Sequence, residues 1–176
     1  MNRGSQLVEL VTESGVHCGQ STVDGAHLAP GLKHRAFSIL LVDDAGRLLL
    51  QRRSAYKTRF PLRWANACCG HPAPGQPVPK AAARRLFEEL SVSGVELAEL
   101  GVYSYVATDP ATGQVEREWD HVLLGRVDPD SPMNPDPAEV AEVRWISPAE
   151  LRFSLQAEPE FYVPWLNGVV ALLPMT

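Results

Sequence analysis

The chain has little that would take it to nucleic acid, to a membrane or through secretion. Its 176 residues carry a net charge of −5 and no long basic block, and nucleic acid binding needs a basic surface. No apolar run approaches the length that spans a bilayer, and the N-terminus lacks the apolar core of a secretory signal. The three cysteines, two of them adjacent, predict no disulfide framework. We therefore expect a cytoplasmic protein in a reducing compartment, without nucleic acid or membrane as a partner.

The composition that remains is typical of one globular domain over residues 1–176, since 45% of the residues are apolar. Apolar runs and turn signals predict strands at 7–11, 36–42, 48–52, 64–70, 95–106, 115–127 and 143–146. Loops are expected at 17–35 and 128–137, and helices at 80–90, after Ser147, and at 160–173 with a kink at Pro164. This order predicts an α/β (or α+β) sandwich, with helices packed on a mixed sheet.

The segment 64–72 carries the most chemistry for its length. Cys69 and His71 are two residues apart, so on an extended backbone their side chains share a face. Gly70 between them leaves space for a ligand to approach the backbone. Cys68 has the opposite parity and is interpreted as a small buried residue.

Three histidines and two glutamates offer a set of metal ligands: His27, His34, His71, Glu116 and Glu118. The two carboxylates are two apart on a predicted strand and share a face, whereas His121 has the opposite parity and is left out. Taken singly, loop histidines and a Glu-x-Glu pair are more often merely solvated. Together they suit a divalent ion such as Mn²⁺ or Zn²⁺, with room for a further ligand.

The helix at 80–90 and the loop before the cysteine strand point to phosphate. Arg85 and Glu89 are i, i+4 neighbours, which alone predicts a weak surface ion pair. The functional alternative is that Glu89 holds Mg²⁺ and Arg85 meets an oxyanion. Five basic residues crowd the loop: Arg52, Arg53, Lys57, Arg59 and Arg63. In an acidic chain this excess favours a diphosphate clamp over a merely solvated loop.

At this point the motifs resemble a known family. Gly70-x5-Gln76-x7-Arg84-Arg85-Leu86-Phe87-Glu88-Glu89-Leu90-Ser91-Val92 is similar to a degenerate Nudix box, whose usual pattern is G-x5-E-x7-R-E-U-x-E-E-x-G-U with U aliphatic. More narrowly, the chain resembles type I isopentenyl diphosphate isomerases. The matching pieces run in order over nearly the whole chain: Ala26-His27, His34 to Ser38, Asn66 with Cys69 to Pro72, Arg84-Arg85 with Glu88 to Leu90, Tyr105 with Ala107 to Pro110, Glu116 with Glu118, and Pro164-Trp165.

The resemblance implies a Nudix-like α/β/α sandwich that converts isopentenyl diphosphate to dimethylallyl diphosphate. It implies Cys69 and Glu118 as the catalytic pair, assisted by Tyr105. The working assignment makes Glu118 with Tyr105 the acid and Cys69 the base, although the sequence does not decide that order.

The resemblance also implies binding roles. A metal would be held by the five histidines and glutamates above, and Mg²⁺ would be bridged by Glu89 to the diphosphate. Arg53, Lys57 and Arg85 match diphosphate-binding positions, and Trp165 matches the aromatic that faces the carbocation. The sequence does not set the oligomeric state, for which a monomer or weak homodimer is the expectation.

Some positions depart from the pattern and keep other functions open. Gln76 and Arg85 replace box carboxylates and Ser91 replaces the glycine, while Val23 stands where some isomerases have a diphosphate-binding lysine. The first alternative is a Nudix hydrolase of a nucleoside diphosphate derivative, which the lost carboxylates disfavour because hydrolysis needs them to assemble metal and water. A non-catalytic diphosphate-binding module and a structural zinc protein are the others. The zinc alternative is disfavoured because structural zinc sites are usually closed and cysteine-rich, whereas this set contains histidines and carboxylates.

Overall fold

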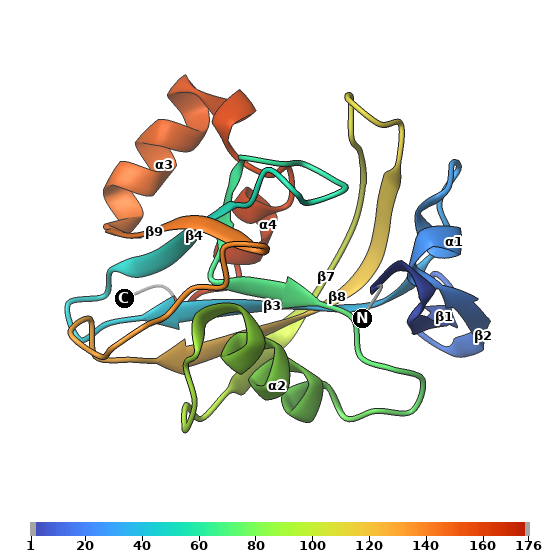
Figure 1. Ribbon diagram of the computed structural model, residues 1–176, viewed down its shortest axis with the longest axis horizontal. Helices are drawn as coiled ribbons and strands as arrows, with labels where there is room; N and C mark the ends of the chain where they lie inside the picture. The colour runs from blue at the N-terminus through green and yellow to red at the C-terminus, as the bar shows by residue number, and fades with distance from the viewer. Residues whose placement is uncertain (1–2, 175–176) are drawn as a thin grey trace.

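The computed structural model describes residues 3–174 and has the expected architecture, a mixed sheet between helices (Figure 1). Its strands are β1 Leu7–Val11, β2 His17–Thr22, β3 His34–Val42, β4 Leu48–Arg53, β5 Trp64–Asn66, β6 Cys68–Gly70, β7 Ala98–Thr108, β8 Val115–Arg126 and β9 Val140–Ile146. Its α-helices are α1 Val23–His27, α2 Val78–Leu90, α3 Pro148–Ala157 and α4 Leu166–Val170, with 3₁₀ turns η1 Arg3–Ser5 and η2 Pro159–Phe161.

Strand β3 is the hub of the sheet. It pairs in parallel with β8 along its whole length, from His34 opposite Glu118 onward, and antiparallel with β6, where Ser38 lies opposite Cys69. β1 and β4 also contact β3, β5 and β9 extend the sheet beyond β4, and β7 flanks β8. This register brings the start of β8 beside the start of β3, while the cysteine strand β6 pairs with the other edge of β3.

The two faces of the sheet bury different helices. Phe37, Ile39 and Leu41 of β3 pack with Leu86 and Leu90 of α2. The alternate residues pack on the other face, in a cluster that contains Leu40 and Val42 of β3, Leu151 of α3, and Leu166 and Val169 of α4. Figure 1 shows α2 on one side of the sheet and α3 with α4 on the other. Period-2 alternation therefore produces the sandwich.

Several local predictions are confirmed. Ser147 and Glu150 form a reciprocal capping box at the start of α3. Gly101 lies at a register shift between β7 and β8, as expected of a bulge. Helix α2 begins at Val78, two residues earlier than predicted, because proline is tolerated in a first helical turn.

The N-terminal prediction was wrong in part. Residues 17–35 are no continuous loop: 17–22 form β2, 23–27 form α1, and His34 opens β3. β2 pairs with β1 at the edge of the sheet and buries none of its side chains fully. Without a buried face the segment has no apolar periodicity to recognise.

Three boundaries also differ. The cysteine strand is two short strands separated at Ala67, and β9 begins three residues before the predicted strand. The C-terminal helix is divided into η2 and the short α4, with Pro159 opening the first and Pro164 preceding the second. Proline lacks the amide hydrogen that a continuous helix needs, so the helix is interrupted where the sequence predicted only a kink.

Candidate active site

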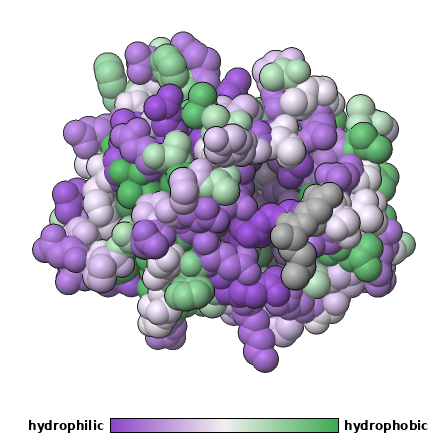
Figure 2. Space-filling model, viewed as in Figure 1, coloured by the Kyte–Doolittle hydropathy of each residue, from purple (hydrophilic) through white to green (hydrophobic). Residues whose placement is uncertain are grey.

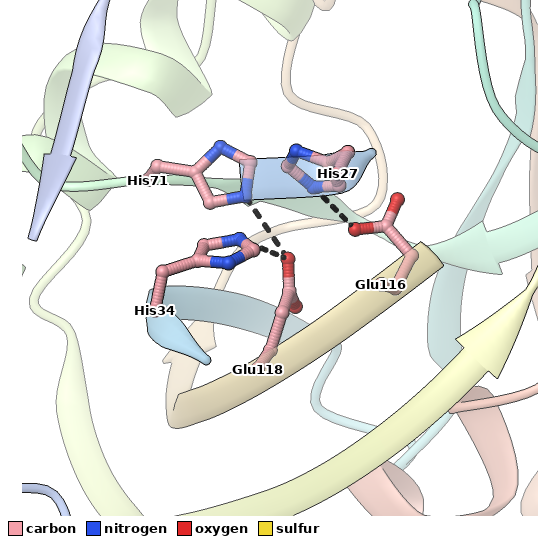
Figure 3. Close-up of side chains that lie close together, drawn as sticks. All are labelled: His27, His34, His71, Glu116 and Glu118. Atoms are coloured by element: carbon pink, nitrogen blue, oxygen red, sulfur yellow. Dashed lines mark hydrogen bonds and ion pairs between the residues drawn. The ribbon is translucent and has the colours of Figure 1, made fainter. Parts of the chain in front are cut away.

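The five predicted metal ligands converge. One ligand atom from each of His27, His34, His71, Glu116 and Glu118 lies within 4.8 Å of all the others, and Figure 3 shows the side chains pointing toward one another. They come from the end of α1, the start of β3, the residue after β6, and the start of β8. Four of these residues are buried and His71 is half-buried.

Backbone carbonyls orient two of the imidazoles. His27 Nδ1 lies 2.6 Å from the Val23 carbonyl oxygen, and His34 Nδ1 lies 2.7 Å from that of Leu32. Because a carbonyl can only accept, each Nδ1 carries the proton and each Nε2 is turned inward. His34 Nε2 is buried and lies 3.6 Å from Glu118 Oε1, which is longer than a hydrogen bond. An orphaned lone pair among carboxylates fits a metal ion, so the residues present suit the predicted group.

Electrostatics keep the cluster ready to bind a cation. Burial lowers the pKa of His71 to about 4, although Glu118 opposes this shift. Burial and the Glu118 charge raise the pKa of Glu116, but the His27 hydrogen bond and Arg59 outweigh them and hold it at about 2. At neutral pH His71 is therefore neutral and Glu116 is ionised, which are the forms that bind metal.

A cavity of about 660 Å³ adjoins this cluster and is lined by Cys69, His71, Tyr105, Glu118 and Trp165, among others. The Tyr105 hydroxyl donates a 2.6 Å hydrogen bond to Glu118 Oε2, and its ring stacks on Trp165 with centroids 5.6 Å apart. Burial, followed by the Glu118 charge, raises the pKa of Tyr105 well above its usual range, so the phenol stays protonated. The cavity thus combines acid–base groups with a π-rich wall.

The catalytic thiol candidate is held by neighbours that its own motif does not reveal. Cys69 Sγ lies 3.2 Å from Asn66 Nδ2 and 3.6 Å from Ser38 Oγ. Ser38 in turn donates a 2.7 Å hydrogen bond to the fully buried Asp120. Burial, with the Asp120 charge, raises the pKa of Cys69 to about 12, so the free chain holds a thiol there.

Strand parity separates the two adjacent thiols as predicted. Cys68 is fully buried in the apolar cluster beneath α2, whereas Cys69 packs against the cluster that contains Trp165. Only Cys69 of the two lines the cavity among the described residues 3–174.

The predicted diphosphate residues line the same cavity. Lys57 and Arg85 both pair with Glu139, the second at 2.8 Å, and both also pair with the buried Glu89. Arg53 donates to the backbone oxygens of Phe60 and Arg59, so it shapes the loop between β4 and β5. Arg53, Lys57 and Arg85 all line the cavity. Glu89 lies outside the five-residue cluster, as a separate predicted Mg²⁺ ligand would.

Sequence reasoning gave no role to four residues that shape this site: Ser38, Asn66, Asp120 and Glu139. Arg59 was expected in the diphosphate clamp, and in the structure it donates to Glu116. Asp120 had a usable signal, because it continues the parity of Glu116 and Glu118 on β8. Glu139 had none, since it follows an irregular proline-rich segment and reaches α2 only through the tertiary fold.

Comparisons with known proteins establish the family of this chain. Residues 32–166 match the model of the NUDIX domain family. Proteins named isopentenyl-diphosphate Delta-isomerase are similar to this chain. That of Nocardia farcinica is 59% identical over 94% of this chain and 93% of its own length. That of Halorhodospira halophila is 38% identical over 96% and 95%. This chain belongs to the isopentenyl-diphosphate Delta-isomerase family, within the Nudix proteins.

Solved structures support the fold at lower identity. A protein from Deinococcus radiodurans shares 21% identity and a TM-score of 0.76, covering 96% of this chain and all of that one. A MutT protein from Methanosarcina mazei shares 18% identity and a TM-score of 0.62, over 79% of this isomerase-family chain and 91% of that protein. Among the helices within residues 3–174, none combines the length and the apolar character that crossing a bilayer requires.

Proposed function

We propose that this chain interconverts isopentenyl diphosphate and dimethylallyl diphosphate as a single-domain isomerase of isoprenoid precursor synthesis. The observation that carries the proposal is the cavity itself. Cys69, the Tyr105–Glu118 pair and Trp165 line one cavity, and the cationic side chains of Arg53, Lys57 and Arg85 line the same cavity. A small apolar chain with a diphosphate head fits a cavity lined by both apolar and cationic side chains.

The reaction needs one proton donor and one proton acceptor. The π electrons of the terminal C=C bond take a proton, which leaves a tertiary carbocation. A base then removes a proton from the neighbouring carbon, and that C–H electron pair forms the new C=C bond. Cys69 of β6 and Glu118 of β8 come from different strands, and both line the cavity. They are the pair proposed for these two steps, with Tyr105 assisting Glu118 through its hydrogen bond.

Protonation in the free chain bears on the order of roles. The pKa of Cys69 is about 12. Burial raises the pKa of Glu118, but the neighbouring His34 and His71 imidazoles outweigh it and hold that pKa well below its usual range. The free chain therefore holds a thiol and a carboxylate, the reverse of the working assignment from sequence. Because the reaction is reversible, each group must carry the proton at one end of the cycle, so both remain in the proposal.

The carbocation also needs protection from water. Trp165 is 3% exposed, and the Arg53 guanidinium lies 5.8 Å from its ring centroid, beside the cavity. Its ring face offers π density to a positive centre, as in cation–π recognition. Stacking on Tyr105 and edge contact with Phe60 hold the indole in place. Trp165 is therefore proposed to stabilise the cation rather than to transfer protons.

The metal assignments follow donor chemistry. The three imidazoles and two carboxylates would hold Mn²⁺ or Zn²⁺, and Glu89, once released from its cations, would share Mg²⁺ with the diphosphate. Bound there, a divalent ion supplies positive charge that favours the ionised form of Glu118 and neutralises the diphosphate.

Hydrolysis is the less favoured activity. Gln76, at the position of a box glutamate, accepts a 3.0 Å hydrogen bond from the Ala73 amide and so supports the local turn. Arg85, at the next lost carboxylate, pairs with Glu89 and Glu139. With Gln76 and Arg85 at these positions, the site lacks two carboxylates that metal-assisted hydrolysis uses to activate water.

The test is incubation of the protein with isopentenyl diphosphate and Mg²⁺, with product analysis for dimethylallyl diphosphate. Parallel reactions contain a nucleotide sugar or a dinucleotide, with released phosphate measured. We expect isomerisation without appreciable hydrolysis. A hydrolytic rate that matches or exceeds the isomerase rate would favour the hydrolase, and binding without any turnover would favour a non-catalytic module.

A further inference from the structure

The cavity receives a cation from a part of the chain that no motif covers. Arg3 of the turn η1 lines it, with its Nε 2.9 Å from Glu139 Oε1 and its Nη2 3.2 Å from Glu88 Oε2. Figure 2 shows hydrophilic side chains gathered around a hollow on this face of the molecule. A residue at the start of the chain thus reaches the same place as Lys57 and Arg85.

The Glu139 carboxylate marks a point on which three cations converge. Lys57 and Arg85 pair with Glu139 Oε2, and Arg3 pairs with Oε1. The charges of Lys57 and Arg85 outweigh the burial of Glu139 and lower its pKa to about 2, so it is an anion throughout the neutral range. The surrounding nitrogens are therefore already arranged around an anionic group, as oxygens of a diphosphate would require.

The turn that carries Arg3 is attached to the body of the protein. The Val23 amide donates to the Gln6 carbonyl at 2.8 Å, and Gly4 packs so closely on Asp24 that a Cβ added there would lie 2.1 Å from its carboxylate. The Arg3 side chain itself is 41% exposed and can exchange partners. Because the turn is fixed and the guanidinium is exposed, Arg3 can exchange the Glu88 and Glu139 carboxylates for a diphosphate.

No other cation serves this side of the cavity within residues 3–27. The wall there is formed by Arg3, Gly4, Gln6, Val23 and Asp24, of which Arg3 alone is positive. We propose that Arg3 is a diphosphate-binding residue, contributed by the N-terminal turn as a further cation beside Arg53, Lys57 and Arg85, in a cavity that Arg59 and Arg84 also line. The proposal rests on the diphosphate substrate named above. The planar Arg3 guanidinium, which pairs with the two carboxylates of Glu88 and Glu139, has the geometry to bind two phosphate oxygens instead.

The experiment measures isomerase kinetics and, separately, the binding of inorganic pyrophosphate with Mg²⁺ by calorimetry, for the wild type and for Arg3→Ala, Arg3→Lys and Arg117→Ala. Arg117 is the matched control, since it is an arginine of similar exposure that pairs with Glu13 and does not line the cavity. For Arg3→Ala we expect KM and the pyrophosphate Kd to rise about tenfold, with kcat within about twofold, because a charge-assisted contact is lost while the reacting groups remain.

The Arg3→Lys variant distinguishes direct phosphate binding by residue 3 from a structural role in anchoring the turn η1. Its single ammonium keeps the charge for phosphate but cannot reproduce the fork that ties Glu88 to Glu139. We expect Arg3→Lys to recover part of the pyrophosphate affinity and Arg117→Ala to match the wild type. Unchanged KM and Kd in Arg3→Ala, or equal losses in Arg3→Lys and Arg3→Ala, would overturn the proposal. If the wild type binds pyrophosphate through Arg3 but shows no isomerase turnover, the proposed function fails and the anion-binding role of Arg3 stands.

Discussion

Cys68 and Cys69 are consecutive residues, yet they face regions of opposite chemistry. Cys68 lies among apolar side chains beneath α2, and burial raises its pKa well above the usual range. Cys69 lines the cavity and is contacted from within the protein by Asn66 and by Ser38, which hydrogen-bonds Asp120. The face that contains Cys68 thus contributes packing, while the face that contains Cys69 carries buried polar groups. Desolvation of these groups costs free energy, which their mutual hydrogen bonds reduce.

The comparison teaches where function can be placed in a sandwich of this kind. On the α2 face the charged residues neutralise one another, since Arg85 and the buried Glu89 meet Lys57 and Glu139. The α4 face carries three buried carboxyl groups on strand β8 itself, Glu116, Glu118 and Asp120. Burying carboxyl groups is costly even when they have hydrogen-bond partners, so their presence points to chemistry.

The largest expected effect separates the two thiols. Cys69→Ala should lower turnover at least ~10²-fold, since it removes one acid–base group. Pyrophosphate binding should remain, because Arg53, Lys57 and Arg85 are untouched. Cys68→Ala should keep most activity and lose some thermal stability through lost packing. Steady-state kinetics of both variants, with calorimetric binding for the first, decide the matter. An inactive Cys68→Ala beside an active Cys69→Ala would refute both the strand register and the assignment of Cys69 as the acid–base thiol.

The bound transition metal should be lost when a residue of the five-residue cluster is replaced, and should be retained when Glu89 is replaced. His71→Ala and Glu116→Ala each remove a ligand from the five-residue cluster, so we expect about one tightly held transition ion per chain to be lost. Glu89→Gln is the matched control, since Glu89 lies outside that cluster on α2 and should leave the transition metal in place. Elemental analysis of the purified proteins measures both. Active wild-type protein without such an ion contradicts the assignment.

A smaller effect should follow from the support of Cys69. Ser38→Ala removes the hydroxyl that lies 3.6 Å from the thiol and hydrogen-bonds Asp120. We expect kcat to fall about tenfold with KM nearly unchanged, because positioning of the thiol matters for the reaction and not for diphosphate binding. Ser38→Thr, which restores a hydroxyl, should recover part of the rate. Equal kcat values for wild type and Ser38→Ala would show that Asn66 alone positions the thiol.

The smallest effect concerns acid stability of the metal-free chain. Glu116 and Glu139 each have a pKa of about 2, against an ordinary value of 4.5. Both values are depressed by folding, so the unfolded state binds protons first as the pH falls. Stability that is present above pH 4.5 should be lost progressively toward pH 2. Thermal midpoints between pH 6 and pH 2 measure this, and Glu139→Gln should reduce the slope. A flat profile in the wild type would argue against these ion pairs.

Much of the site was predictable from residue types and parity. Strand alternation placed Cys69 on the face opposite Cys68 and set Glu116 on the same face as Glu118, as the structure has them. The strands with a buried face were also found, because period-2 burial leaves a pattern in the sequence. Strand β2 and helix α1 were missed because β2 has no fully buried side chain and α1 is only five residues long.

The sequence by itself therefore determined the fold class, the family and the ligand types, since these depend on local periodicity and on ordered motifs. Only the tertiary structure decided which groups meet. Parallel pairing of β3 with β8 brings His34 beside Glu118, and the path of the chain after β8 brings Glu139 to Lys57 and Arg85. Arg3 reaches the same point from the other end of the chain. Such contacts join residues far apart in sequence, where no spacing rule operates and the packing of whole elements sets the distance.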